Sequence, residues 1–427
     1  MPGAGPAADA GAVIAATNQA WAFALLDELA RAGVRHVSLC PGSRSTPLAV
    51  AAARHPALRL WVHLDERSAA FFGLGLARAS GEPVALIATS GTAPANFFPA
   101  VMEARYGRVP LIVLSADRPH ELREFGAPQT VDQVHLYGRH AKWFADLPVP
   151  EAGAAAQRYV RQLAARAVLE AVSPPAGPVH LNVPFREPLV APAAEGAGAR
   201  GGASPGGAPA GPALTGNASD GPALTADAAA GPALAVPPPA GAARQGREGA
   251  GAEPAAAPVW VAAPALAPAQ VDELAALLAS GRRGLIVCGP MSRPDLAPAV
   301  TRLAARLGFP ILADPLSGVR CGPHDRTAVI DAYDAFLREP RLAAALAPDV
   351  VLRLGAVPTS KPLLQFLERH PGARQILLDE AGWHDPGHVA RLVVRADPVL
   401  ACHQLADRLE GRPASHPPGR PGGAFAG

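Results

Sequence analysis

The sequence predicts an α/β protein with two doubly wound, parallel-sheet domains joined by a long disordered linker. Short apolar runs alternate with helical segments in residues 19–189, and the same alternation returns in residues 258–411. Such alternation is typical of parallel sheets that helices cover on both faces. The expected divisions are a disordered N-terminus (1–18), a first domain (19–189), a low-complexity linker (190–257), a central domain (258–411) and a disordered tail (412–427).

The first domain is expected to contain five strands, and helical segments separate most of them. The apolar runs that predict strands are residues 34–40, 58–64, 83–89, 110–116 and 177–185. The segments with helical periodicity are residues 18–33, 66–81 and 93–107, with a shorter helix at 46–55 and another that ends at Val172.

The central domain repeats this pattern on a smaller scale. Helices are expected at residues 269–281, 295–308 and 361–370, and strands at 283–289, 309–314, 349–355 and 375–380. The linker before it consists mainly of Ala, Gly, Pro, Ser and Thr, and a ten-residue repeat begins at Gly211, Gly221 and Gly231. A segment of this composition buries too little apolar surface to offset its ordering entropy.

Composition argues against several classes of function. The formal net charge of +2 favours neither nucleic acid nor a membrane surface as a partner. We find neither a signal peptide nor an apolar run long enough to span a membrane. The 4 cysteines are far apart, which fits a reducing, cytoplasmic location. His384 and His388 do not form a helical metal pair because Pro386 lies between them.

Polar phrases follow four of the predicted strands of the first domain. They are PGSRS at residues 41–45, DERS at 65–68, TSGTA at 89–93 and ADRP at 116–119. In open α/β sheets, ligands bind beyond the carboxyl ends of the strands. Four such phrases on one edge therefore indicate a binding site there.

With GAPQTVDQ at residues 126–133 and GPVHLNVPFREPL at 177–189, these phrases resemble one family. It is the 2-succinyl-5-enolpyruvyl-6-hydroxy-3-cyclohexene-1-carboxylate synthases of menaquinone biosynthesis, which use thiamine diphosphate. The resemblance implies decarboxylation of 2-oxoglutarate and addition of the resulting carbanion to isochorismate. It also implies a homodimer, with the cofactor between the pyrimidine-binding domain of one subunit and the diphosphate-binding domain of another.

Glu66 is the residue that the resemblance identifies as catalytic. The matching glutamate contacts N1′ of the cofactor's aminopyrimidine, and the resemblance places Gly42, Gly91 and Asn96 beside the cofactor. We expect burial to raise the pKa of Glu66, against the opposing effect of the helix dipole. The alternative is that Glu66 and Asp65 only cap a helix.

Substrate binding is expected at Ser43, Arg44, Arg118, Gln129 and Lys361, which match substrate-binding positions of the family. Both substrates carry two carboxylates, and a guanidinium group binds a carboxylate through two hydrogen bonds. The alternative for the arginines is a role in surface salt bridges. For Lys361, a solvated lysine at the start of a helix is an equally good interpretation. Pro362 stands where the family often has a second basic residue.

The GDG motif that binds Mg²⁺ and diphosphate in this superfamily is absent from the 427 residues. Its absence predicts that the metal ligands belong to another domain. That domain is supplied by a separate chain, has been lost, or is missing because of an error in the gene sequence. The chain alone is then expected to have negligible activity. Two other functions are possible: a non-catalytic module that binds dicarboxylates or pairs with a synthase, and a sister enzyme of the acetolactate-synthase kind.

Overall fold

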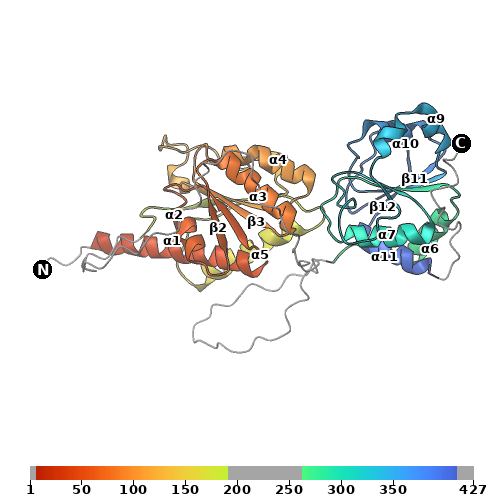
Figure 1. Cartoon of the computed structure of the whole chain (residues 1–427). Coiled ribbons are helices and arrows are strands. Elements are labelled where there is room, and N and C mark those ends of the chain that lie inside the picture. Colours follow the sequence, from red (N-terminus) through yellow and green to blue (C-terminus); the bar gives the residue numbers. More distant parts are fainter. Residues whose placement is uncertain (1–5, 191–261, 411–427) are drawn as a thin grey trace, which may run out of the picture.

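The computed structural model describes residues 6–190 and 262–410. These residues form two α/β units, each built on a six-stranded sheet (Figure 1). Every strand pair in the two sheets is parallel. The predicted fold class of two parallel-sheet domains is therefore confirmed. The expected linker after Val190 and the expected tail lie outside the described residues.

The first sheet has the strand order β2-β1-β3-β4-β6-β5. Its strands are β1 (His36–Leu39), β2 (Arg59–Val62), β3 (Val84–Ala88), β4 (Leu111–Asp117), β5 (Trp143–Asp146) and β6 (Val179–Pro184). From β1 the chain adds β2 on one side and then returns to add β3 on the other. The order therefore reverses between β1 and β3, and that is where open α/β sheets hold ligands.

Helices cover this sheet on both faces. They are α1 (Pro6–Arg31), α2 (Thr46–Arg54), α3 (Glu66–Ser80), α4 (Phe98–Gly107) and α5 (Ala154–Val172), with short 3₁₀ turns η1 (Pro94–Phe97), η2 (His120–Leu122) and η3 (Gly138–His140). One apolar core joins α1, α2 and α5 to the sheet, and a second joins α3 and α4 to its other face. The sheet is thus the middle of three layers, with only its edges open.

The N-terminus differs from the prediction. We expected residues 1–18 to lack order, yet α1 begins at Pro6, and Ala15 is fully buried. Asn18 is also buried, and its side chain donates hydrogen bonds to the carbonyl oxygens of Arg186 (2.8 Å) and Pro188 (3.2 Å). These contacts with the segment after β6 give the middle of α1 tertiary partners, which the Ala-rich sequence alone does not reveal.

The second sheet has the order β12-β11-β10-β7-β8-β9. Its strands are β7 (Gly284–Cys288), β8 (Ile311–Ala313), β9 (Val329–Ile330), β10 (Val350–Leu354), β11 (Arg374–Asp379) and β12 (Ala390–Arg395). Its helices are α6 (Pro268–Ala279), α7 (Leu296–Leu307), α8 (Tyr333–Leu337), α9 (Pro340–Ala345), α10 (Lys361–Arg369) and α11 (Pro398–Arg408). Separate apolar cores again lie on the two faces of the sheet.

Arg108 connects the two units. It ends α4 in the left-handed conformation, with φ 55°. Its Nη1 and Nη2 donate to the two carboxylate oxygens of Asp379, at 3.1 and 2.8 Å, at the end of β11. Its Nη2 also lies 2.8 Å from His384 Nε2. Although burial alone would raise the pKa of Asp379, hydrogen bonds from Arg108 and from two backbone amides lower it, so this carboxylate stays charged.

Replacing this arginine tests how far the contact fixes the two units. In Arg108→Gln, the 1%-exposed carboxylate of Asp379 loses its bidentate partner, and we expect the free energy of unfolding to fall by about 2 kcal/mol. Small-angle scattering should also detect wider motion of the units. The control Arg338→Gln removes an exposed pair within one helix turn and should change neither quantity. Unchanged scattering in Arg108→Gln would show that other contacts hold the units.

Candidate functional site

The two loops at the reversal of the first sheet touch each other. A Cβ atom on Gly42, in the loop after β1, would lie 2.5 Å from Cβ of Thr89, which follows β3. Only a glycine therefore permits this approach of the two loops. The Oγ1 atom of Thr89 is buried and has no hydrogen-bond partner in the described part of the chain. The Oγ1 atom of Thr89 is therefore able to form a hydrogen bond with a ligand.

Glu66 opens α3, as predicted, but it does not cap the helix. The cap is Asp65, whose carboxylate accepts a hydrogen bond from the backbone N–H of Ser68 at 2.7 Å. Burial, and then the charge of Glu66, raise the pKa of Cys40 to about 12, so Glu66 lies near the end of β1. Within residues 6–190 and 262–410, no hydrogen bond or ion pair involves the half-buried carboxylate of Glu66. It is therefore available to a ligand.

Arg118 joins the loops that follow β3 and β4. Its Nη1 donates to Ser90 Oγ through a short contact and to the backbone oxygen of Gln129 at 2.9 Å. The side chain of Gln129 donates from Nε2 to the backbone oxygen of Ser90 at 3.0 Å. The structure thus brings together Arg118, Gln129 and Gly91, three of the residues that the sequence predicted.

Arg44 lies close to this cluster and is only 5% exposed. Its Nη1 donates to the backbone oxygen of Phe185 at 2.8 Å, and its Nη2 donates to Glu187 Oε1 at 2.7 Å. Its Nε is buried without a hydrogen-bond partner among the described residues. Burial, and then the charge of Arg44, lower the pKa of Arg118. Two neighbouring guanidinium groups create a local positive potential that favours an anion.

The remaining predicted residues are exposed and make fewer contacts with the cluster around Arg118. Ser43 is exposed in the loop after β1, and its backbone oxygen accepts a hydrogen bond from Thr46 Oγ1 at 2.6 Å. Asn96 is exposed in η1, where its Nδ2 donates to the Thr92 carbonyl at 3.2 Å. Lys361 is exposed at the first residue of α10, in the other unit. Among the residues that the structure describes, no hydrogen bond or ion pair joins Lys361 to the first sheet.

A buried polar network lies beneath the loops, and the sequence analysis did not identify it. His180 and Asn182 are buried in β6, and Ser115 is buried in β4. The Oγ atom of Ser115 lies 2.7 Å from His180 Nε2 and donates to Asn182 Oδ1 at 3.0 Å. Burial lowers the pKa of His180 to about 3, so this imidazole is neutral in the folded protein. The one available signal was the presence of His and Asn within an otherwise apolar strand.

The neutral imidazole predicts a specific dependence of stability on pH. The unfolded chain protonates His180 below its ordinary pKa of 6.5, whereas the folded protein does so only near pH 3. The stability is therefore complete above pH 6.5 and is lost as the pH falls towards 3, by up to about 1.4 kcal/mol per pH unit. We expect denaturant titrations of His180→Gln to give a shallower slope between pH 6 and 4.5 than the wild type. The control variant His403→Gln, at a half-buried histidine of α11, should keep the wild-type slope, and equal slopes in all three proteins would contradict this explanation.

Gly91 has a backbone that other residues adopt only with strain. Its φ is +86°, and a Cβ atom there would lie 2.8 Å from Cγ of Gln129. We expect Gly91→Ala to lower the free energy of unfolding by about 1–2 kcal/mol. Gly75→Ala is the matched control, because a Cβ on that helical residue meets nothing within 4 Å and should raise stability by up to about 1 kcal/mol. Urea titrations measure both, and equal effects would contradict the strain at Gly91.

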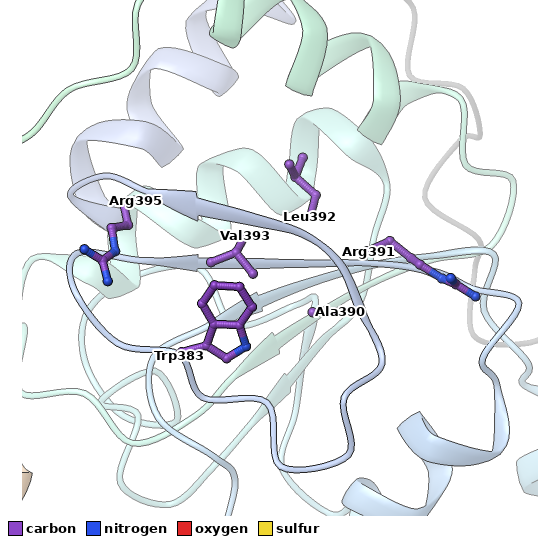
Figure 2. Close-up of a pocket in the computed structure, with 6 residues that line it drawn as sticks. All are labelled: Trp383, Ala390, Arg391, Leu392, Val393 and Arg395. Carbon is purple, nitrogen blue, oxygen red and sulfur yellow. The ribbon is translucent and has the colours of Figure 1, made fainter.

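A hollow elsewhere on the surface does not coincide with this cluster. Figure 2 shows the residues that line it, which are Trp383, Ala390, Arg391, Leu392, Val393 and Arg395. They belong to the edge strand β12 of the second sheet and the loop before it. None of the residues that the sequence predicted for the site lines this hollow.

The cluster at the reversal of the first sheet meets some requirements of a thiamine-diphosphate site. Buried atoms without partners among the described residues include Thr89 Oγ1, Arg44 Nε and His63 Nε2, and Glu66 has a free carboxylate. The described residues contain no group of three or more His, Cys, Asp or Glu side chains that could hold a metal ion. Within these residues, no helix is both long and apolar enough to cross a membrane.

Comparisons with known proteins identify the families of the two units. Residues 20–136 match the family described as "Thiamine pyrophosphate enzyme, N-terminal TPP binding domain", and residues 259–410 match the "Middle domain of thiamine pyrophosphate" enzymes. A solved structure of a candidate thiamin diphosphate-dependent enzyme from Mycobacterium smegmatis has a TM-score of 0.57 at 18% identity, over 92% of this chain and 63% of that one. This last likeness concerns the fold.

Residues 20–136 and 259–410 therefore correspond to the N-terminal and middle domains of thiamine-pyrophosphate enzymes. Within that class the chain is similar to proteins named 2-succinyl-5-enolpyruvyl-6-hydroxy-3-cyclohexene-1-carboxylate synthase. It is 49% identical to that of Geobacillus kaustophilus over 91% of this chain and 59% of the relative. It is 47% identical to that of Chloroflexus aurantiacus over 91% of this chain and 58% of the relative. The chain thus spans less than two thirds of the length of these relatives.

Proposed function

We propose that the chain supplies the pyrimidine-binding half of a synthase that decarboxylates 2-oxoglutarate and joins the remaining four-carbon unit to isochorismate. The product is 2-succinyl-5-enolpyruvyl-6-hydroxy-3-cyclohexene-1-carboxylate, an intermediate of menaquinone biosynthesis. The observation that carries the proposal is the position of Glu66, Arg44 and Arg118 after the parallel strands β2, β1 and β4, at one edge of the first sheet. The names of the relatives support it, and the four free thiols suit a cytoplasmic location.

The proposed role of Glu66 is to exchange a proton with the aminopyrimidine ring of the cofactor. Bound thiamine diphosphate supplies a carbon nucleophile and a sink for the electrons released by decarboxylation. The carboxyl group of Glu66 holds a proton at N1′ of the pyrimidine, and Asp65 frees it for this role by capping α3. Gly42 and Gly91 have no side chains, so the loops that contain them can approach each other and the cofactor closely. Asn96 follows in the 3₁₀ turn η1.

The dicarboxylate substrates bind beside this acid. Arg44 and Arg118 provide charge and bidentate donors, while Ser43 and Gln129 provide hydrogen bonds. Lys361 is proposed as an additional carboxylate ligand from the central unit. The guanidinium groups of Arg44 and Arg118 repel each other, and a bound carboxylate relieves that repulsion.

The diphosphate and Mg²⁺ require groups from outside the described residues. We propose that a second subunit or a separate diphosphate-binding chain supplies them. The outer face of α3 and α4 is a suitable surface for such a partner, since Phe71, Met102 and Tyr106 are 39%, 38% and 75% exposed there. A homodimer and a heteromeric assembly are both consistent with this surface.

A non-catalytic dicarboxylate-binding module is the second candidate function. The observation that favours it is the pair of neighbouring guanidinium groups of Arg44 and Arg118, which would attract a dicarboxylate without any contribution from Glu66. Such a module would bind dicarboxylates whether or not Glu66 is intact, and it would form no product.

Product formation tests the proposed function. We would supply 2-oxoglutarate, isochorismate, thiamine diphosphate and Mg²⁺ to the chain alone and to the chain with a diphosphate-binding domain from a relative. We expect product only in the mixture, and Glu66→Gln should lower kcat at least about 100-fold. The control Glu151→Gln changes an exposed residue and should have no effect. Turnover by the chain alone would contradict the need for a partner, and use of pyruvate in place of 2-oxoglutarate would favour an acetolactate-synthase-like enzyme.

Binding of 2-oxoglutarate tests the arginines separately. Arg118→Lys keeps the charge but loses the planar fork, so we expect calorimetry to give an affinity about tenfold lower. Arg166→Lys makes the same change at an exposed pair with Glu170 and should leave the affinity unchanged. Equal affinities in the two variants would place the substrate elsewhere.

A further inference from the structure

Gln133 is a buried amide at the centre of the candidate site. It lies between η2 and η3, in the last position of the phrase GAPQTVDQ, and is 1% exposed. The resemblance to known synthases assigned a role to Gln129 in that phrase and left Gln133 without one. A glutamine this deeply buried needs partners for all of its polar atoms.

Its amide contacts three separate elements. The Oε1 atom accepts a hydrogen bond from the backbone N–H of Gly91 at 2.9 Å. The Nε2 atom donates to the backbone oxygen of Ala116, at 3.1 Å, and to Asn182 Oδ1, at 2.9 Å. Gln133 therefore links the loop after β3 to the ends of β4 and β6.

The hydrogen-bond partners fix the orientation of this amide. The group of Gly91 that faces Gln133 is its backbone N–H, so the side-chain atom opposite it must be the oxygen of Gln133. Asn182 Nδ2 donates to Asp117 Oδ2 (2.8 Å) and Asp146 Oδ1 (2.9 Å), so the Asn182 oxygen must face Gln133. Rotation of either side-chain amide by half a turn would place a donor against a donor or an acceptor against an acceptor. The network therefore permits one arrangement.

The loop that Gln133 holds carries the groups proposed to bind substrate. Gly91 follows Ser90, whose hydroxyl accepts from Arg118 and whose carbonyl accepts from the side chain of Gln129. With its φ of +86°, Gly91 directs its N–H inward to Gln133 rather than outward. Displacement of Gly91 would therefore move Ser90, and with it the anchor of both Arg118 and Gln129.

We propose that Gln133 is a positioning residue: its amide sets the backbone at Gly91 and thereby the places of Arg118 and Gln129. Its effect on ligand binding rests on the proposed function. Its effect on the loop does not, and the two can be measured separately. Gln133 itself does not touch the substrate.

The wild-type protein provides the first measurement. The Gly91 amide lies in a loop, yet its hydrogen bond to a buried oxygen should slow its exchange with solvent to a rate typical of β3 and β4. Hydrogen exchange measured for this amide tests that statement without any substitution. Rapid exchange at Gly91 would overturn the proposal.

Two variants provide the second measurement. Gln133→Met has a similar size and removes all three hydrogen bonds, so we expect exchange at Gly91 to rise at least tenfold and the affinity for 2-oxoglutarate to fall about tenfold. Gln375→Met is the control, because Gln375 is also fully buried and its Nε2 donates to the Leu367 carbonyl in the other unit. It should lower the melting temperature but change neither exchange at Gly91 nor affinity.

The outcomes separate the two proposals. A lower melting temperature in Gln133→Met with wild-type exchange at Gly91 and wild-type affinity would reduce Gln133 to a structural residue and overturn its positioning role. If the wild type does not bind 2-oxoglutarate, the proposed function fails. The exchange of Gly91 in Gln133→Met then still decides whether Gln133 positions the loop.

Discussion

The parallel pairing of β1, β3, β4 and β6 is the constraint on which the rest of the site depends. Because these strands run in one direction, the segments that follow them emerge at one edge of the sheet. Gly42, Gly91 and Arg118 come from three of these segments, and Glu66 comes from the segment after the neighbouring strand β2.

The edge of the sheet is held by polar groups rather than by apolar packing. Asn182 uses both of its side-chain atoms within a buried network that reaches Ser115 and Gln133 on one side and two aspartates on the other. Arg123 adds contacts to those aspartates, at 3.1 Å from Asp117 and 2.8 Å from Asp146. Directional bonds of this kind fix loops more narrowly than apolar contacts, which tolerate small shifts.

The sequence predicted the central parts of both sheets because their strands are continuous apolar runs. The strands β5, β9 and β12 were not predicted, since each lies at the edge of a sheet and is only partly buried or short. The short helices α8 and α9 also escaped detection because five or six residues give no clear period. Burial of Ala15 and Asn18 in α1 depends on tertiary contacts that the sequence does not display.

The residues of the candidate site were predicted from phrases at the ends of strands, but its buried polar partners were not. Gln133 and Asn182 are buried polar residues, and a sequence pattern does not show which partners satisfy them. Arg44 was expected to face a ligand, but it also bonds to Phe185 and Glu187, so its role is partly structural. The position of Lys361 on another unit could not be related to the first sheet without coordinates.

The most direct test of the account is a crystal structure of the chain with 2-oxoglutarate bound. The account predicts that a carboxylate of the ligand lies at the edge of the first sheet, within hydrogen-bond distance of Arg118 and near Gly42. A ligand bound instead in the hollow over β12, or at any site remote from the end of β4, would contradict the assignment of this edge as the binding site.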